Sequence, residues 1–93
     1  MAEIRESRRV LYRGRVQGVG FRYTTCEVAQ GYAVTGFVRN LRSGQVELMV
    51  EGNPVELDRF LAAVAAAMTG FIDDQAIEKG SASGTFTSFE IRH

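Results

Sequence analysis

Hydrophobic positions in the first half of the chain switch between the spacing of strands and the spacing of helices. The stretch Arg8–Gln17 alternates between apolar and mostly charged residues, a period of two that predicts a strand. Apolar residues then recur at helical spacing over Phe21–Gln30. Residues 34–39 and 46–50 alternate like strands, and the turn-forming residues of 40–44 between them predict a hairpin.

The best-marked helix begins at Asn53. Asparagine is a preferred N-cap, Pro54 fits the first helical position, and Glu56 follows three residues after the cap. Thr69-Gly70 ends the helix, and its apolar face predicts packing against a sheet rather than a ligand groove. That face consists of Leu57, Phe60, Leu61, Val64 and Met68.

The last part of the chain has weaker strand signals. Residues 72–79 predict a strand, 80–84 form a Gly/Ser loop, and alternation over 89–92 predicts a short closing strand. With residues 1–7 as a frayed polar lead-in, this order of elements predicts an α+β, ferredoxin-like split βαβ (βαββαβ) fold. We expect an antiparallel sheet with two helices on one face, in a single domain over residues 1–93.

Composition narrows the chemistry that the chain can support. Its 93 residues, 45% of them hydrophobic, suffice for one packed core, and the lone Cys26 cannot form an internal disulfide. No cluster of cysteine and histidine is present to bind zinc, and we expect neither a metal nor a cofactor. No apolar run reaches membrane-spanning length and the N-terminus is too charged for a signal peptide, so we expect a cytoplasmic protein with no membrane partner.

A net charge of zero conceals two oppositely charged halves. Residues 1–42 hold eight arginines against three glutamates, a net charge of +5. Residues 43–93 hold three basic residues against eight acidic ones, a net charge of −5. A basic half favours a small anionic ligand, but it lacks the global basicity of nucleic-acid-binding proteins, so no nucleic-acid partner is expected.

The segment from Gln17 to Arg22 joins the first predicted strand to the first predicted helix. Gly18 and Gly20 allow a tight turn that directs backbone N–H groups and the positive end of the helix at one point. Arg22 opposes the helix dipole unless an anion lies between them, which favours a cradle for a phosphoryl group or inorganic phosphate. Glycines that merely permit a turn beside a solvated arginine stay an open alternative, and neither a dinucleotide fingerprint nor a Walker loop fits the spacing.

Other side chains give little support to nucleophilic catalysis. The only histidine, His93, ends the chain, and Cys26 lies in the predicted helix, where a free cysteine is usually a buried apolar residue. Asp73 and Asp74 are adjacent on a predicted strand and therefore point to opposite faces. Asn40, at the end of the second strand, can orient a water toward a bound phosphoryl group or simply form the turn, and both interpretations stay open.

Two motifs resemble the acylphosphatase family. They are G-R-V-Q-G-V-G-F-R at residues 14–22 and G-F-V-R-N at residues 36–40, with further agreement at Gly44, 46–47, 51–52 and 89–92. The resemblance extends from Val10 to Arg92. Residues 69–84 depart from the family's pattern, which leaves the ends of the fourth strand open. Leu41 also departs from it, because some family members carry threonine at this position, so any assisting hydroxyl is absent here.

The resemblance implies a metal-independent hydrolase of carboxyl-phosphate mixed anhydrides, acting on a small-molecule acyl phosphate. Arg22 and Asn40 match the family's catalytic arginine and asparagine. Its phosphate-binding loop matches Gln17, Gly18, Val19, Gly20 and Phe21. The implied mechanism is in-line attack by a water that Asn40 positions, on a phosphoryl group held by Arg22 and the backbone amides.

Two further functions stay open beside hydrolysis. One is a non-catalytic module on the same fold that senses phosphate or a similar anion. The other is that the domain acts on carbamoyl phosphate as part of a larger maturation enzyme. The end of the chain just after the last strand favours a free-standing protein over this second alternative. A monomer is expected because no large apolar surface patch is evident.

Overall fold

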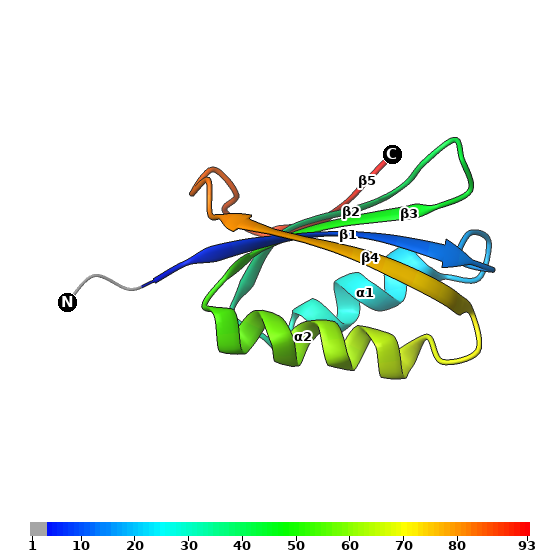
Figure 1. Ribbon diagram of the computed structural model, residues 1–93, viewed down its shortest axis with the longest axis horizontal. Coiled ribbons are helices and arrows are strands. Elements are labelled where there is room, and N and C mark those ends of the chain that lie inside the picture. Colours follow the sequence, from blue (N-terminus) through cyan, green and yellow to red (C-terminus); the bar gives the residue numbers. More distant parts are fainter. Residues whose placement is uncertain (1–3) are drawn as a thin grey trace.

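The computed structural model describes residues 4–93, which form five strands and two helices around one sheet (Figure 1). The elements are β1 (Glu6–Gly14), α1 (Phe21–Ala29), β2 (Val34–Asn40), β3 (Val46–Gly52), α2 (Pro54–Ala67), β4 (Ile72–Ser81) and β5 (Phe89–Arg92). The predicted sequence of elements is therefore confirmed, including the short strand that closes the chain.

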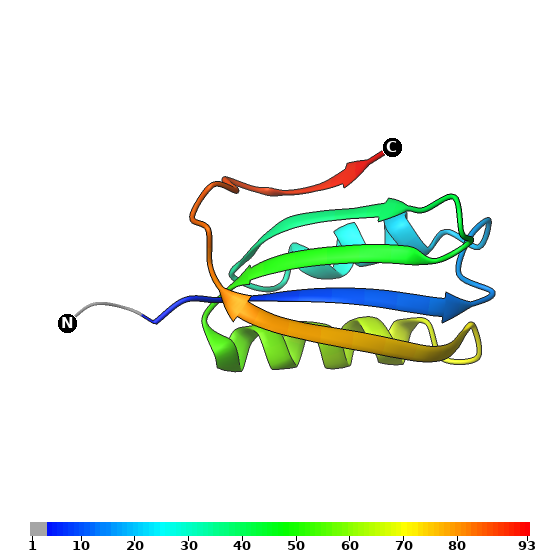
Figure 2. The same cartoon turned by 45° about the horizontal axis from the view of Figure 1, so that its top comes forward.

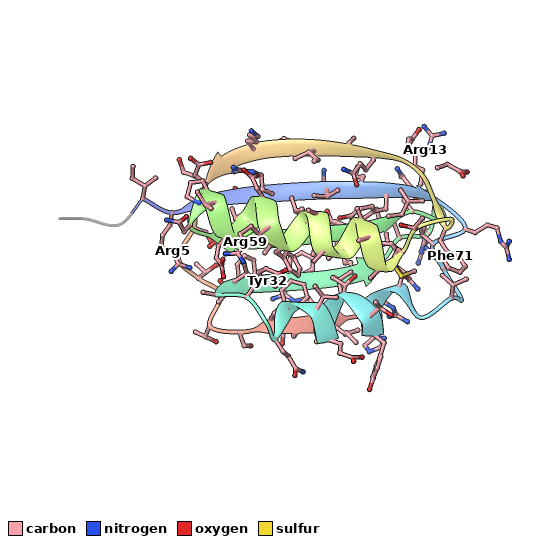
Figure 3. The ribbon with its side chains drawn as sticks, turned by 90° about the horizontal axis from the view of Figure 1, so that it is seen from below. Arg5, Arg13, Tyr32, Arg59 and Phe71 are labelled. Carbon is pink, nitrogen blue, oxygen red and sulfur yellow. The ribbon has the colours of Figure 1, made fainter. Side chains whose placement is uncertain are left out.

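The strands form one sheet in the order β4-β1-β3-β2-β5 (Figure 2). Neighbouring strands are antiparallel from β4 to β2, whereas β5 pairs with β2 in parallel. Both helices cover the same face, with α1 against β2 and β5 and α2 against β3 and β2 (Figure 3). The ferredoxin-like α+β prediction with two helices on one face is confirmed. The expected antiparallel arrangement is wrong only for β5, because the chain returns along the outer edge of β2 and runs parallel to it, so the sheet is mixed.

The core lies between the sheet and the two helices. Alternate residues of β1 and β3 point into it. The apolar face that the sequence predicts packs there from α2 and its C-cap Met68, with Leu61 only partly buried. The side chain of Asn53 accepts a hydrogen bond of 3.0 Å from the N–H of Val55, which confirms the predicted cap. Glu56 does not complete a capping box, because its carboxylate accepts the N–H of Ala33 at 2.9 Å and thereby ties the start of β2 to α2.

Element ends differ from the predictions where tertiary contacts decide them. The prediction of a frayed segment over residues 1–7 is wrong for residues 6 and 7, because β1 begins at Glu6, which pairs with Gly52 and Ser81. Residues 1–3 lie outside the described part of the chain. The first strand ends at Gly14 rather than Gln17, where the register with β4 shifts. No helix in residues 4–93 has the length and apolar character needed to cross a membrane.

An ion-pair cluster on the helix-free face joins the three central strands. Glu47 on β3 is only 4% exposed, and its carboxylate accepts hydrogen bonds from Arg9 on β1 at 2.6 Å and Arg39 on β2 at 2.5 Å. Burial raises the pKa of Glu47, but the hydrogen bonds and charges of Arg39 and Arg9 lower it by more, so its pKa lies below the usual value. The cluster therefore holds β2 in place one residue before Asn40.

Candidate active site

An open pocket of about 310 Å³ lies where the β1–α1 loop meets the ends of β2 and β5. The loop and the β2–β3 turn come together at the same end of the molecule (Figure 1). Five of the residues predicted from the sequence line this pocket: Gly18, Gly20, Phe21, Arg22 and Asn40. The fold thus brings together residues from two motifs that are separate in the sequence.

The loop conformation depends on Gly18 and Gly20. Their φ angles are 76° and 78°, in the left-handed region, and a Cβ atom at either position would meet no other atom within 4 Å. Backbone conformation rather than lack of space therefore requires glycine here, since other residues pay roughly 1–2 kcal/mol in this region. Both glycines line the pocket, and a turn of this kind can aim successive backbone N–H groups at one point, an arrangement that binds anions.

The first turn of α1 offers hydrogen-bond donors to the pocket. Gly20 is the N-cap and has no side chain to accept from the helix, and the first turn contains no acidic residue. The earliest bond of the helix runs from the N–H of Thr24 to the carbonyl of Gly20 at 2.9 Å. Within residues 4–93 the N–H groups of residues 21–23 have no acceptor, so with the helix dipole they favour an anion.

Arg22 extends across the pocket to the end of β5. Its Nη1 donates to the carbonyl of Arg92 at 3.4 Å and lies 3.2 Å from Nδ1 of His93. Its Nε and Nη2 have no hydrogen-bond partner within residues 4–93 and can form a two-pronged contact with an oxyanion. Sequence reasoning missed the part of His93, because 71 positions separate the two residues and no local pattern links them.

Gln17 connects the loop to the β2–β3 hairpin. Its Nε2 donates to the carbonyl of Leu41 at 2.7 Å and to that of Gln45 at 2.9 Å. The side chain therefore points to the turn that follows Asn40, and neither Gln17 nor Val19 lines the pocket. Val19 packs against the hydrophobic core instead. The predicted part of these two residues in substrate binding stays a prediction, and only their main chain is available for it.

Asn40 is the last residue of β2 and pairs with Val46 of β3. The turn beyond it closes through the N–H of Leu41, which donates to the carbonyl of Gln45 at 2.8 Å. The same carbonyl accepts from Gln17, so the position of the Asn40 backbone is coupled to the loop on the other side of the pocket. A neutral carboxamide is thereby placed in one pocket with Arg22 and the first turn of α1.

The described residues include no group of three or more histidine, cysteine and acidic side chains placed to hold a metal ion. Cys26 is partly exposed rather than buried as the sequence suggested, because it lies at the edge of α1, where its Sγ donates to the carbonyl of Phe89 at 3.9 Å. The pocket therefore offers N–H donors, a guanidinium and a carboxamide, groups that stabilise negative charge and orient a water.

Known proteins with the same sequence pattern identify the family. The acylphosphatase family model matches residues 8–91. An acylphosphatase of Syntrophotalea carbinolica is 38% identical to this chain, in an alignment that covers 90% of this chain and 92% of that protein. An acylphosphatase of a Synechococcus species is 39% identical, over 89% of this chain and 88% of that protein. The crystal structure of acylphosphatase from Bacillus subtilis has a TM-score of 0.87 and 30% identity, over 95% of this chain and 99% of that one. The chain thus belongs to the acylphosphatase family.

Proposed function

We propose that this enzyme of the acylphosphatase family hydrolyses acyl phosphates by in-line attack of a water on phosphorus. The bond between phosphorus and the acyl oxygen breaks, a bond from phosphorus to the water oxygen forms, and the products are a carboxylate, inorganic phosphate and a proton. One observation carries this proposal: Arg22, Asn40 and the first turn of α1 line a single pocket.

The phosphoryl group is held by the main chain of residues 18–22 and by Arg22. The N–H groups at the start of α1 receive its oxygens, and Nε and Nη2 of Arg22 grip two of them side by side. Because Nη1 is anchored to the end of β5, the guanidinium is oriented before the substrate binds. Donors fixed in this way stabilise charge that develops in the transition state, and each is typically worth about 10²–10³ in rate.

Asn40 orients the attacking water. Its side-chain oxygen accepts a hydrogen bond from the water, which turns a lone pair of the water toward phosphorus. Transfer of a phosphoryl group passes through a loose transition state, so positioning matters more than deprotonation of the nucleophile. The leaving carboxylate has a pKa of roughly 4 and needs no general acid. This agrees with the pocket, where none of the lining residues from the described part of the chain is acidic.

We also propose the conditions under which the protein works. The reaction proceeds without a metal ion, the substrate is a small-molecule acyl phosphate, and inorganic phosphate binds in the same cradle as a product. The enzyme acts as a monomer in the cytoplasm, a setting supported by the single unpaired cysteine. Activity in excess chelator and a hydrodynamic radius matching one chain are the measurements that check these points.

The decisive experiment compares the wild type with Arg22→Ala and Asn40→Ala, using benzoyl phosphate in the presence of chelator. The kcat of each variant is expected to be lower than that of the wild type by a factor of about 10²–10³. Arg59→Ala is the matched control, because this arginine lies on α2 with a side chain that is 69% exposed. A wild type that binds inorganic phosphate without turnover would instead support a phosphate-sensing module. Activity retained in Asn40→Ala would remove the assigned role of the carboxamide.

A further inference from the structure

We propose that the acyl group of the substrate lies in a groove between α1 and β5, lined by Tyr23, Cys26 and Ile91. The enzyme accordingly favours bulky apolar acyl groups over the acetyl group. This inference rests on the proposed function, because it assigns the part of the substrate that the phosphate cradle does not hold.

The lining of the active-site pocket divides into two chemically different walls. One wall carries the groups assigned to the phosphoryl group and the water. The other carries Tyr23 from α1 and Ile91 from β5, and His93, which contacts Arg22, lies between the two walls. Tyr23 is a large hydrophobic side chain that is nevertheless 70% exposed, and it takes no part in the core. An aromatic ring left exposed at the rim of a pocket is available to a ligand.

The apolar wall continues away from the cradle as a groove. A second hollow of about 130 Å³ shares Tyr23 and Ile91 with the active-site pocket and extends to Cys26, and the exposed Glu27 and Gln30 complete its lining. A third, of about 210 Å³, also includes Cys26 and ends at Tyr32 and Phe89. The hollow of 130 Å³ therefore connects the other two, because it shares Tyr23 and Ile91 with the active-site pocket and Cys26 with the third hollow.

Secondary-structure spacing explains why the groove is continuous. Tyr23 and Cys26 are three residues apart on α1 and so lie on one face of the helix. Phe89 and Ile91 are two residues apart on β5 and point to the helix-covered face of the sheet. Because α1 lies across β5 (Figure 3), the two rows face each other, and the contact between Sγ of Cys26 and the carbonyl of Phe89 forms the floor between them.

The geometry of the reaction directs the acyl group toward this groove. In-line displacement places the attacking water and the departing acyl oxygen on opposite sides of phosphorus. Asn40 holds the water from the sheet, at the end of β2. The acyl group therefore departs on the side of α1, where Tyr23 begins the groove.

The test measures kcat/KM for acetyl, butyryl, hexanoyl and benzoyl phosphate. Full burial of one methylene group would raise kcat/KM about fourfold. Because the groove is open on one side, we expect half of this effect on a logarithmic scale, so each added methylene should raise kcat/KM of the wild type about twofold. The aliphatic acids differ little in leaving-group strength, so this trend reports binding. Tyr23→Ala should lower the ratio of benzoyl to acetyl phosphate by about three- to tenfold, the scale of one aromatic contact.

Two control variants make the result specific. Tyr23→Phe keeps the ring and should preserve the wild-type ratio, and Val55→Ala removes an apolar side chain that is 66% exposed on α2 and should leave every constant unchanged. Equal kcat/KM along the aliphatic series, or an unchanged ratio in Tyr23→Ala, would overturn the groove while hydrolysis itself stands. A wild type that hydrolyses none of the four would overturn the proposed function and the groove together.

Discussion

Replacing Gln17 by alanine separates the holding of phosphate from the positioning of the water. The change removes two hydrogen bonds, of 2.7 and 2.9 Å, that tie the cradle loop to the carbonyls of Leu41 and Gln45. Each such bond contributes about 0.5–1.5 kcal/mol net, so the free energy of unfolding should fall by about 1–3 kcal/mol. We expect the turn of the loop to stay intact, because its left-handed φ angles occur at Gly18 and Gly20, which the substitution leaves in place.

The kinetic effect of Gln17→Ala should fall on kcat rather than on phosphate binding. Without the link, the hairpin that carries Asn40 shifts relative to the cradle, and a displacement near 1 Å can reduce a rate by up to about 10²-fold. We expect kcat for benzoyl phosphate to fall between about tenfold and 10²-fold. Competitive inhibition by inorganic phosphate should weaken by less than about threefold, because the main-chain donors at the start of α1 remain.

Steady-state kinetics with phosphate inhibition, together with urea unfolding, measure these effects. Gln75→Ala on β4 is the matched control, because this glutamine is exposed, is not a pocket-lining residue and lies on the edge strand opposite β5. An unchanged kcat with lower stability would show that Gln17 is purely structural. A loss of phosphate affinity in parallel with kcat would show that its side chain binds the substrate directly.

Three further predictions follow from the same structure. Arg39 and Arg9 lower the pKa of Glu47 on folding. The Glu47 carboxylate therefore stabilises the folded protein fully at pH values above its unfolded-state pKa of about 4.3. This stabilisation is lost as the pH falls through the lower pKa of the folded state. Urea unfolding from pH 7 to pH 3 should therefore show a shallower acid dependence in Glu47→Gln than in the wild type; an identical slope would contradict the pairing. Gly20→Ala should lower the free energy of unfolding by about 1–2 kcal/mol and weaken phosphate inhibition, since a Cβ disfavours the left-handed conformation. Asn53→Ala should cost about 1 kcal/mol in thermal unfolding while kcat stays unchanged, and a change in kcat would show that the cap of α2 influences the site.

The fold could be predicted because local signals agree along most of the chain. The alternation within β1 and β3, the cap at Asn53 and the glycine turn at residues 18–20 each determine one element by itself. The signal for β4 is weak for a physical reason. This edge strand pairs with β1 but is exposed over residues 73–81, so burial imposes no alternation of apolar side chains. The length of β4 is set by its pairing with β1, and no local pattern in the sequence reveals this pairing.

The site could be predicted as a set of residues but not as an arrangement. Arg22 and the glycines lie in one contiguous motif, and Asn40 occupies the end of a predictable strand. The contact of Gln17 with the hairpin spans 24 and 28 positions, and that of Arg22 with His93 spans 71. Such contacts depend on the order of the strands in the sheet. No pattern in the sequence indicates that β5 pairs with β2 in parallel.

Hydrolysis in oxygen-18-labelled water tests most directly whether the cradle holds the reacting atom. If the phosphoryl group lies on the first turn of α1 and Asn40 directs water at phosphorus, the label must appear in inorganic phosphate and the released benzoate must be unlabelled. Mass spectrometry of both products after limited turnover gives the answer, with spontaneous hydrolysis subtracted. Label in the benzoate would place the attack at the carbonyl carbon and contradict the assigned roles of Arg22 and Asn40.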